Sequence, residues 1–303
     1  MIGREEVRAA LTGPFPSLRV PFSRDGDIDY GGLRNMVDRA IAGGAKTALL
    51  TWGDSLYSLM TDDEVAEVTR VVAEHAAGRA MVVAADNQWW TGKTVEFAKY
   101  CREVGADVLM VLPPDWGRSC TPATLVEHYA AVAEHVPVMV VTNVFATSPE
   151  RGLETLAALQ DRVDGVVAVK DDVGGDFARK TCLLVGDRLA VFSSGKKRAH
   201  LDALERGAVG YMSTFVLFQP SVAHEFWQAV QGKDRTAAER VIEDHDDPFF
   251  DYILSLQGGF DAGMHGLFEL YGIAGRWRRK PYHSLTDGEL EALANFCKTR
   301  GWL

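Results

Sequence analysis

Short apolar runs alternate with longer amphipathic segments along the first 230 residues of the chain. The short runs are rich in Val, Leu, Ala and Met, and several are apolar throughout, as strands covered on both faces must be. Alternation of this kind is typical of parallel β-strands joined by crossover helices. We predict eight strands, at Ser17–Pro21, Thr47–Thr51, Met81–Ala85, Val108–Leu112, Val138–Asn143, Val166–Lys170, Ala190–Ser194 and Val209–Ser213.

Helix-starting signals lie a few residues after several of these strands. Each combines Ser or Thr with a favourable following residue, at Thr61 with Glu64, at Thr91, at Thr121 with Pro122 and at Ser148 with Pro149. Right-handed crossovers leave two architectures, an open sheet or a closed barrel. Because the chain has no G-x-G-x-x-G phosphate loop, we predict the closed α/β form, a (β/α)₈ or TIM barrel.

Past Gln231 the pattern changes to helices without intervening strands. The apolar spacing predicts three helices, at Thr236–Leu256, Asp261–Tyr271 and Thr286–Thr299. We therefore divide the chain into a barrel, residues 1–230, and a C-terminal helical region packed on it, residues 231–303. This region is expected to cover the flank of the barrel or to form a subunit contact, and an independent small domain is the alternative.

The formal net charge of −10 argues against nucleic-acid binding, which needs a clustered Lys and Arg surface. The basic run 196–198 is expected to be a solvated face or to supply salt-bridge partners, and the acidic run 243–247 to be a solvated helix end. The four cysteines are scattered, so we predict neither disulfides nor a metal site. Without a signal peptide or a run of about 18 apolar residues, the protein is expected to be cytoplasmic and not to bind membranes.

Five motifs in the chain resemble those of one enzyme superfamily. They are S-L-R-V-P-F-S-R-D-G-D-I-D-Y-G-G-L-R from residue 17, V-V-A-V-K-D-D from residue 166, F-S-S-G from residue 192, G-A-V-G-Y-M-S from residue 207 and G-L-F-E-L-Y-G-I-A-G-R from residue 266. In this order they resemble the dihydrodipicolinate synthase and N-acetylneuraminate lyase superfamily. The resemblance covers nearly the whole chain and is therefore specific for the fold.

For function, the resemblance implies a Schiff-base lyase. Members of the superfamily are aldolases, lyases or dehydratases that join a lysine to a 2-oxo acid, usually pyruvate, and many are homotetramers. We therefore expect this chain to act on a 2-oxo acid such as pyruvate or a keto-sugar acid, without a cofactor. We also expect it to form a homo-oligomer, either a tetramer or a dimer.

Lys170 is the predicted Schiff-base lysine. It ends the apolar run V-V-A-V, and the C-terminal ends of barrel strands form the active-site face. Partial desolvation there disfavours the ammonium form, and carbonyl attack requires a free amine. The alternative is a strand-end lysine that reaches to water or pairs with Asp171 or Asp172. Lys46 precedes its strand and therefore belongs to the opposite face.

The chain departs from the superfamily at the proton relay. A tyrosine is expected at the end of the fifth strand, but Thr142 stands there, in T-N-V-F. A threonine hydroxyl is shorter and far less acidic than a phenol, so the role does not simply transfer. The arginine that often follows this motif is also missing, which argues against lysine biosynthesis. Tyr57, after the second strand, is the predicted substitute, and Thr142 and Tyr57 are therefore the candidate proton-moving residues.

The second departure concerns the 2-oxo acid carboxylate. A G-T-T-G-E motif in the superfamily corresponds here to 52–56, W-G-D-S-L, so Gly53, Asp54 and Ser55 are the candidate binding residues. Asp54 would repel a carboxylate if its side chain pointed inward, so either it points away or the ligand differs. From the seventh and eighth strands we add Ser194, Gly195 and Met212.

Two hypotheses follow from these departures. The first is an active enzyme, an aldolase or hydro-lyase in which the imine on Lys170 acts as the electron sink. The second is a catalytically impaired paralogue that binds a metabolite or a protein partner. The loop after the third strand carries Trp89 and Trp90, and the loop after the fourth carries Asp115 and Trp116. These tryptophans either crowd the barrel mouth, or pack at a subunit interface or cover the loops.

Overall fold

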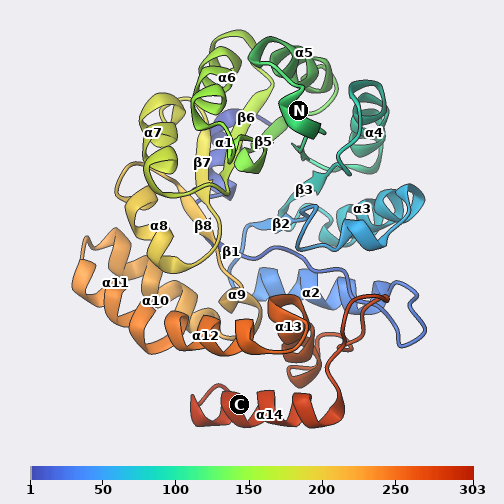
Figure 1. Cartoon of the computed structure of the whole chain (residues 1–303), viewed down its shortest axis with the longest axis vertical. Helices are drawn as coiled ribbons and strands as arrows, with labels where there is room; N and C mark the ends of the chain where they lie inside the picture. Colours follow the sequence, from blue (N-terminus) through green and yellow to red (C-terminus); the bar gives the residue numbers. More distant parts are fainter. Residues whose placement is uncertain (1) are drawn as a thin grey trace.

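The computed structural model describes residues 2–303 and contains a ring of eight parallel strands (Figure 1). Neighbouring strands pair in the order β1-β8-β7-β6-β5-β4-β3-β2. A parallel bridge between Ser17 and Leu49 joins the segment after β1 to β2 and closes the ring. This confirms the predicted (β/α)₈ barrel. The strands are β1 (Gly13–Phe15), β2 (Thr47–Leu49), β3 (Met81–Ala85), β4 (Val108–Val111), β5 (Val138–Val141), β6 (Val166–Asp171), β7 (Ala190–Ser193) and β8 (Gly210–Met212).

The first strand begins earlier than the apolar pattern predicts. β1 is Gly13–Phe15, and the predicted strand Ser17–Pro21 pairs with β2 only at the Ser17 bridge and through the Leu18 N–H, which donates to Leu49 at 2.7 Å. Gly and Pro are weak strand formers, so the true strand carries little signal. Its partner Gly210 has no room for a side chain, because a Cβ there would lie 2.1 Å from the carbonyl oxygen of Leu11.

The helices surround the strands, and several begin at the predicted signals. Thr61 caps its helix in a capping box with Glu64, and Thr121 caps the helix that starts at Pro122. Each crossover returns the chain to the start of the next parallel strand, so the C-terminal ends of the strands all lie at one face of the barrel. The helices of the barrel are α1 (Arg4–Ala10), α2 (Tyr30–Ala42), α3 (Asp62–Ala76), α4 (Thr91–Val104), α5 (Pro122–Ala133), α6 (Pro149–Arg162), α7 (Gly175–Val185), α8 (Lys197–Leu204), α9 (Phe215–Phe218) and α10 (Pro220–Gln231), with 3₁₀ turns η1 (Tyr57–Leu59), η2 (Trp116–Arg118) and η3 (Thr142–Phe145).

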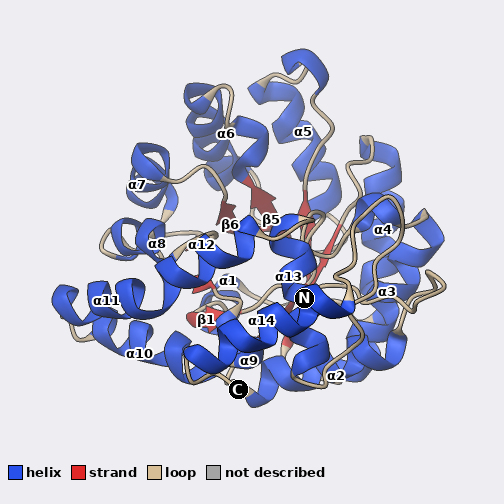
Figure 2. Ribbon diagram, turned by 60° about the horizontal axis from the view of Figure 1, so that its bottom comes forward, coloured by secondary structure: helices blue, strands red, loops and turns tan. Residues whose placement is uncertain are grey.

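The C-terminal region lies across the barrel, and α12, α13 and α14 cross in front of strands in Figure 2. The predicted helix Thr236–Leu256 consists of two α-helices joined by a π-helical turn. The region comprises α11 (Arg235–Val241), η4 (Ile242–Asp246), α12 (Asp247–Ser255), α13 (Gly259–Leu270) and α14 (Asp287–Thr299). Ion pairs from Asp246 and Asp261 to barrel residues fasten it in place. Among residues 2–303, no helix has the length and apolar character that a membrane span requires.

Candidate active site

A cavity of about 590 Å³ opens at the C-terminal ends of the strands. Its wall combines residues that follow β2, β6, β7 and β8 with apolar side chains from α12 and α13. The helical region therefore helps to form the cavity, and does more than cover the barrel flank as expected. Its contributions are Phe250, Leu254 and Phe260.

Lys170 lies in this cavity, as predicted. It is the penultimate residue of β6, where all six positions are buried, and its side chain is 9% exposed. Its amine forms an ion pair with Asp172, so the alternative of a local pairing is realised as well. Both residues line the cavity, and the amine is therefore accessible to a small molecule within it.

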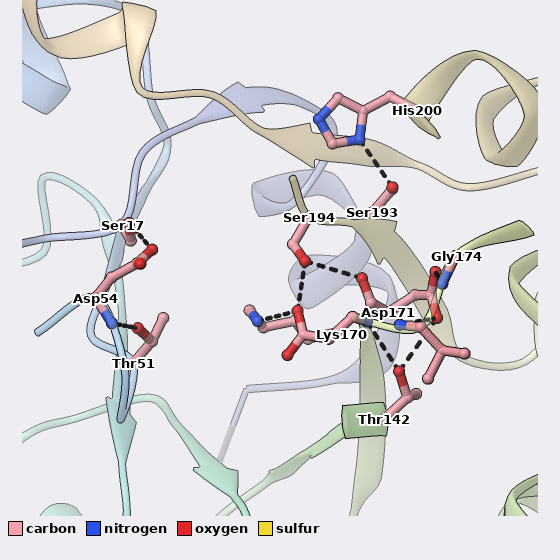
Figure 3. Close-up of polar contacts among 12 residues, drawn as sticks. Ser17, Thr51, Asp54, Thr142, Lys170, Asp171, Gly174, Ser193, Ser194 and His200 are labelled. Carbon is pink, nitrogen blue, oxygen red and sulfur yellow. Dashed lines mark hydrogen bonds and ion pairs between the residues drawn. The ribbon is translucent and has the colours of Figure 1, made fainter. Parts of the chain in front are cut away.

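Asp172 connects Lys170 to the seventh strand. The hydroxyl of Ser194 contacts the same carboxylate oxygen, Oδ1, that accepts from Lys170 Nζ. The Ser194 hydroxyl also lies 3.0 Å from the carbonyl oxygen of Asp171, so it has two acceptors within reach (Figure 3). Ser194 and Gly195 line the cavity, as predicted.

Thr142 forms hydrogen bonds with Asp171 and Asp172 from a buried position outside the cavity. Its side chain is fully buried, donates to Asp171 Oδ1 at 3.1 Å and accepts from the backbone N–H of Asp172 at 2.9 Å. Its neighbours Val141 and Asn143 line the cavity, whereas Thr142 does not. The Thr142 hydroxyl is therefore occupied in holding the end of β6, and the structure gives no support for it as a proton relay.

Asp171 is the buried partner of Thr142. Burial raises the pKa of its carboxyl, although hydrogen bonds from Val173, Thr142 and Gly174 oppose the rise. The backbone N–H groups of Val173 and Gly174 donate at 3.3 and 3.1 Å. The carboxyl thus shapes the loop that leaves β6.

The structure places Tyr57 outside the cavity. Leu56 adopts a left-handed conformation (φ 60°), and the η1 turn that follows carries Tyr57 into the core. The side chain is completely buried and its hydroxyl has no hydrogen-bond partner among residues 2–303. Burial raises the pKa of Tyr57 further above its usual value, which also makes proton transfer harder. The prediction of Tyr57 as a substitute relay is therefore not supported.

The residues predicted to hold a carboxylate are only partly brought together. Gly53 and Asp54, which follow β2, line the cavity. Met212, at the end of β8, also lines it, and the segment that includes β1 lies between β2 and β8. Ser55 does not line it, because its buried hydroxyl donates to the Leu18 carbonyl at 2.5 Å and accepts from Thr51 N–H at 3.0 Å. Ser55 is therefore a loop-forming residue.

Asp54 points into the cavity wall, where Arg19 neutralises it. Arg19 lies 3.1 Å from Asp54 and also pairs with Asp261 of α13, while Ser17 donates to Asp54 at 2.5 Å. Burial alone would raise the pKa of Asp54, but Arg19, Ser17 and the charge of Lys170 together lower it. Asp54 is consequently ionised, and the repulsion expected from its charge is offset by Arg19.

Sequence reasoning missed Arg19 and Asp86 in the cavity wall. Arg19 is 1% exposed and its guanidinium lies over the Phe260 ring. Its only sequence signal is a charged residue within an apolar segment. Asp86 follows β3, accepts from Leu112 N–H at 2.9 Å and is fully buried. Burial raises the pKa of Asp86 to about 7, despite its hydrogen bonds.

The aromatic residues of the cavity differ from those predicted. Trp89 is buried against α3 through a 3.0 Å hydrogen bond to Asp62, and Trp90 and Trp116 are 68% and 93% exposed. None of these three lines the cavity, whose aromatic side chains are Trp52, Phe250 and Phe260. The predicted crowding of the mouth by the third and fourth loops is therefore wrong. Within residues 2–303, no group of three or more His, Cys, Asp or Glu side chains could hold a metal ion.

Comparisons with known proteins agree with this geometry. The model of the Dihydrodipicolinate synthetase family matches residues 10–300. A 4-hydroxy-tetrahydrodipicolinate synthase from Psychrobacter arcticus is 28% identical, covering 94% of this chain and 96% of that protein. A Streptomyces coelicolor protein named probable 5-dehydro-4-deoxyglucarate dehydratase 1 is 29% identical, covering 80% of this chain and 79% of that protein.

Solved structures show the same fold. Dihydrodipicolinate synthase from Bacillus clausii matches with a TM-score of 0.82 at 22% identity, covering 97% of this chain and 99% of that one. N-acetylneuraminate lyase from Fusobacterium nucleatum matches with a TM-score of 0.84 at 17% identity, covering 95% and 98%. The fold and the cavity together define a (β/α)₈ barrel with a buried lysine near the C-terminal end of its sixth strand. The chain belongs to the dihydrodipicolinate synthetase family, as a distant member.

Proposed function

We propose that this protein is a Schiff-base-forming lyase, an aldolase or hydro-lyase that acts on a 2-oxo acid such as pyruvate or a keto-sugar acid. The observation that carries the proposal is the position of Lys170, largely buried and yet bordering a cavity of about 590 Å³. This volume lies within the usual range of small-molecule sites, about 300–1,000 Å³. The names of its relatives, which include a synthase, a lyase and a dehydratase, support the same class of chemistry.

The proposed reaction begins with attack of the Lys170 amine on the C2 carbonyl carbon. The carbinolamine that forms loses water and becomes an imine. The imine accepts the electron pair when a bond to the neighbouring carbon breaks, and the resulting enamine donates that pair when a new bond to this carbon forms. Before the attack, the Lys170 ammonium, which pairs with Asp172, must lose a proton. The backbone around Gly53 and Met212 and the hydroxyl of Ser194 border the space left for the substrate carboxylate and its oxygens.

The second candidate function is a catalytically impaired paralogue that binds a metabolite or a protein partner. The observation that favours it is the loss of both expected relays, because Thr142 is engaged by Asp171 and Asp172 and Tyr57 is sealed in the core. A cytoplasmic location and a homo-oligomeric state, tetramer or dimer, remain predictions.

Borohydride trapping tests the proposed function. The folded protein is incubated with pyruvate or other 2-oxo acids, reduced, digested and mapped by mass spectrometry. We expect a reduced adduct on Lys170, its loss in Lys170→Met, and its retention in the control Lys46→Met, which removes an exposed lysine before β2. No adduct on the folded wild-type protein with any 2-oxo acid would overturn the proposal and favour the binding function.

A further inference from the structure

We infer that Asp172, held by Ser194, is the group that moves the proton between the substrate carbon and solvent. The inference rests on the proposed function, because it concerns the imine on Lys170. It answers a chemical requirement that the site must meet: the carbon next to the imine has to lose and regain a proton, and neither Thr142 nor Tyr57 presents a free group to the cavity.

The position of the Asp172 carboxylate carries the inference. Oδ1 contacts the Lys170 amine directly, and Oδ2 has no hydrogen-bond partner among residues 2–303. The reacting C3 carbon of a 2-oxo acid lies two bonds from the nitrogen once the imine has formed. A base that contacts the nitrogen is therefore within reach of the C3 hydrogens. The side chain is 19% exposed and borders the cavity, so it can exchange its proton with water.

Asp172 is also held in a defined orientation. Thr142 accepts a hydrogen bond from its backbone N–H, and Ser194, the residue after β7, contacts its carboxylate. Ser194 is anchored in turn, since its own N–H donates to the carbonyl of Asp171 at 3.1 Å. A base fixed in this way needs little reorganisation to reach its proton. The buried Thr142 thus acts as a positioning residue.

The other carboxylates of the cavity are less suited to this step. Asp54 is bound by Arg19 and Ser17, which keep it ionised and occupied. Asp86 accepts from Leu112 N–H and from Thr94 of α4, a helix behind the strands, so its oxygens are turned toward the barrel wall. Asp172 is the carboxylate that contacts the nitrogen.

The proposed step balances as follows. In the protonated imine, Asp172 removes one hydrogen from C3 as a proton, and the C3–H electron pair becomes the C2–C3 double bond. The C2–N π electrons move to nitrogen, which leaves a neutral enamine and a protonated Asp172. In heavy water the carboxylic acid exchanges its proton for a deuteron and returns it to C3, and hydrolysis then releases deuterated substrate and free Lys170.

The test measures deuterium exchange into the methyl group of pyruvate by proton NMR. Wild type should catalyse this exchange, and Asp172→Asn should slow it by about 10²- to 10⁴-fold, the usual contribution of a positioned acid or base. Asp172→Asn should still give a borohydride adduct on Lys170, because the imine can form without C3 proton loss. Asp176→Asn, which removes an exposed carboxylate in the next helix, is the matched control and should exchange like wild type.

Ser194→Ala separates the base from its support. It removes the hydroxyl that contacts Asp172, and we expect a smaller loss of exchange, about tenfold, with the adduct retained. Asp172→Asn that forms the adduct and exchanges at the wild-type rate would overturn the inference. Folded Asp172→Asn that forms no adduct would also overturn it, by assigning Asp172 to imine formation. No adduct on wild type would instead overturn the proposed function itself.

Discussion

Within residues 2–303, two lysine–aspartate pairs have a buried lysine, and their surroundings differ. Lys170 and Asp172 have side chains that are 9% and 19% exposed, and both border the cavity. Lys197 and Asp246 are each 2% exposed, their atoms lie 2.7 Å apart, and neither borders the cavity. The Lys197 amine also lies 4.0 Å from the centre of the Phe215 ring. The first pair is accessible to a ligand, whereas the second is sealed by protein.

The difference shows that burial and pairing do not by themselves place a lysine beside the cavity. Burial lowers the pKa of Lys197, and the charge and hydrogen bond of Asp246 oppose this. Lys197 therefore has the environment often associated with reactive amines, but no space for a carbonyl beside it. Its position instead joins the π turn η4 to the start of α8, directly after the cavity residues Ser194, Gly195 and Lys196. We call Lys197 and Asp246 the sealed pair, and Lys170 and Asp172 the open pair. The sealed pair holds the end of the loop that carries Ser194, and Ser194 contacts Asp172 of the open pair.

The largest expected effect comes from breaking the sealed pair. Asp246→Ala leaves a buried ammonium and an unsatisfied Lys197 N–H, and should lower the free energy of unfolding by about 3–5 kcal/mol. Urea unfolding measures this. The double variant Lys197→Met with Asp246→Leu should recover most of the loss, because it removes both charges together. A loss below about 1 kcal/mol in Asp246→Ala would show that water reaches this pair.

The next effect concerns His200, which lies beside the sealed pair. Burial, followed by the charge of Lys197, lowers the pKa of His200 to about 3. The unfolded chain then binds more protons than the native protein below pH 6.5. Stability is therefore complete above about pH 6.5 and falls as the pH drops toward 3, by up to about 1.4 kcal/mol per pH unit.

His200→Gln should flatten this dependence, since it keeps a polar side chain near Ser193 but removes the titrating ring. Urea unfolding of both proteins between about pH 7 and about pH 4 measures the difference, and contributions from other groups, such as buried His128, cancel in it. Equal slopes for the two proteins would mean that water reaches His200 in the folded protein.

The smallest expected effect comes from the open pair. Asp172→Asn should change the free energy of unfolding by no more than about 1 kcal/mol, because the Lys170 ammonium can be hydrated from the cavity. The same urea measurement applies. A loss as large as that of Asp246→Ala would contradict the contrast between the pairs, and would identify Asp172 as a structural residue.

The strand pattern located the face with the cavity because parallel strands all point the same way. Lys170, at the end of an apolar run, lies in the cavity, whereas exposed Lys46 precedes β2 at the other end. This reasoning predicted the barrel and placed seven of its strands to within a few residues. It also predicted that Gly53, Ser194 and Met212 line the cavity. The short strand β1 could not be predicted, because its residues Gly13 and Pro14 are weak strand formers.

The acidic run 243–247 shows a failure of local reasoning. It was expected to be a solvated helix end, but Asp246 is buried against Lys197, 49 residues away in sequence. A π turn, which inserts an extra residue into the helix, places Asp246 toward the barrel. The expected salt-bridge role of the basic run 196–198 is confirmed at Lys197 and Arg198.

Periodicity and strand direction thus determined the barrel, the end at which the cavity opens and the position of Lys170, because each is a local property of an apolar segment and its neighbours. Only the tertiary structure decided which polar groups face the cavity. Ser55 and Tyr57 turn into the core, while Arg19 and Asp172 reach the cavity wall. The reason is that a loop side chain is directed by contacts with elements distant in sequence, and sequence spacing does not encode those contacts.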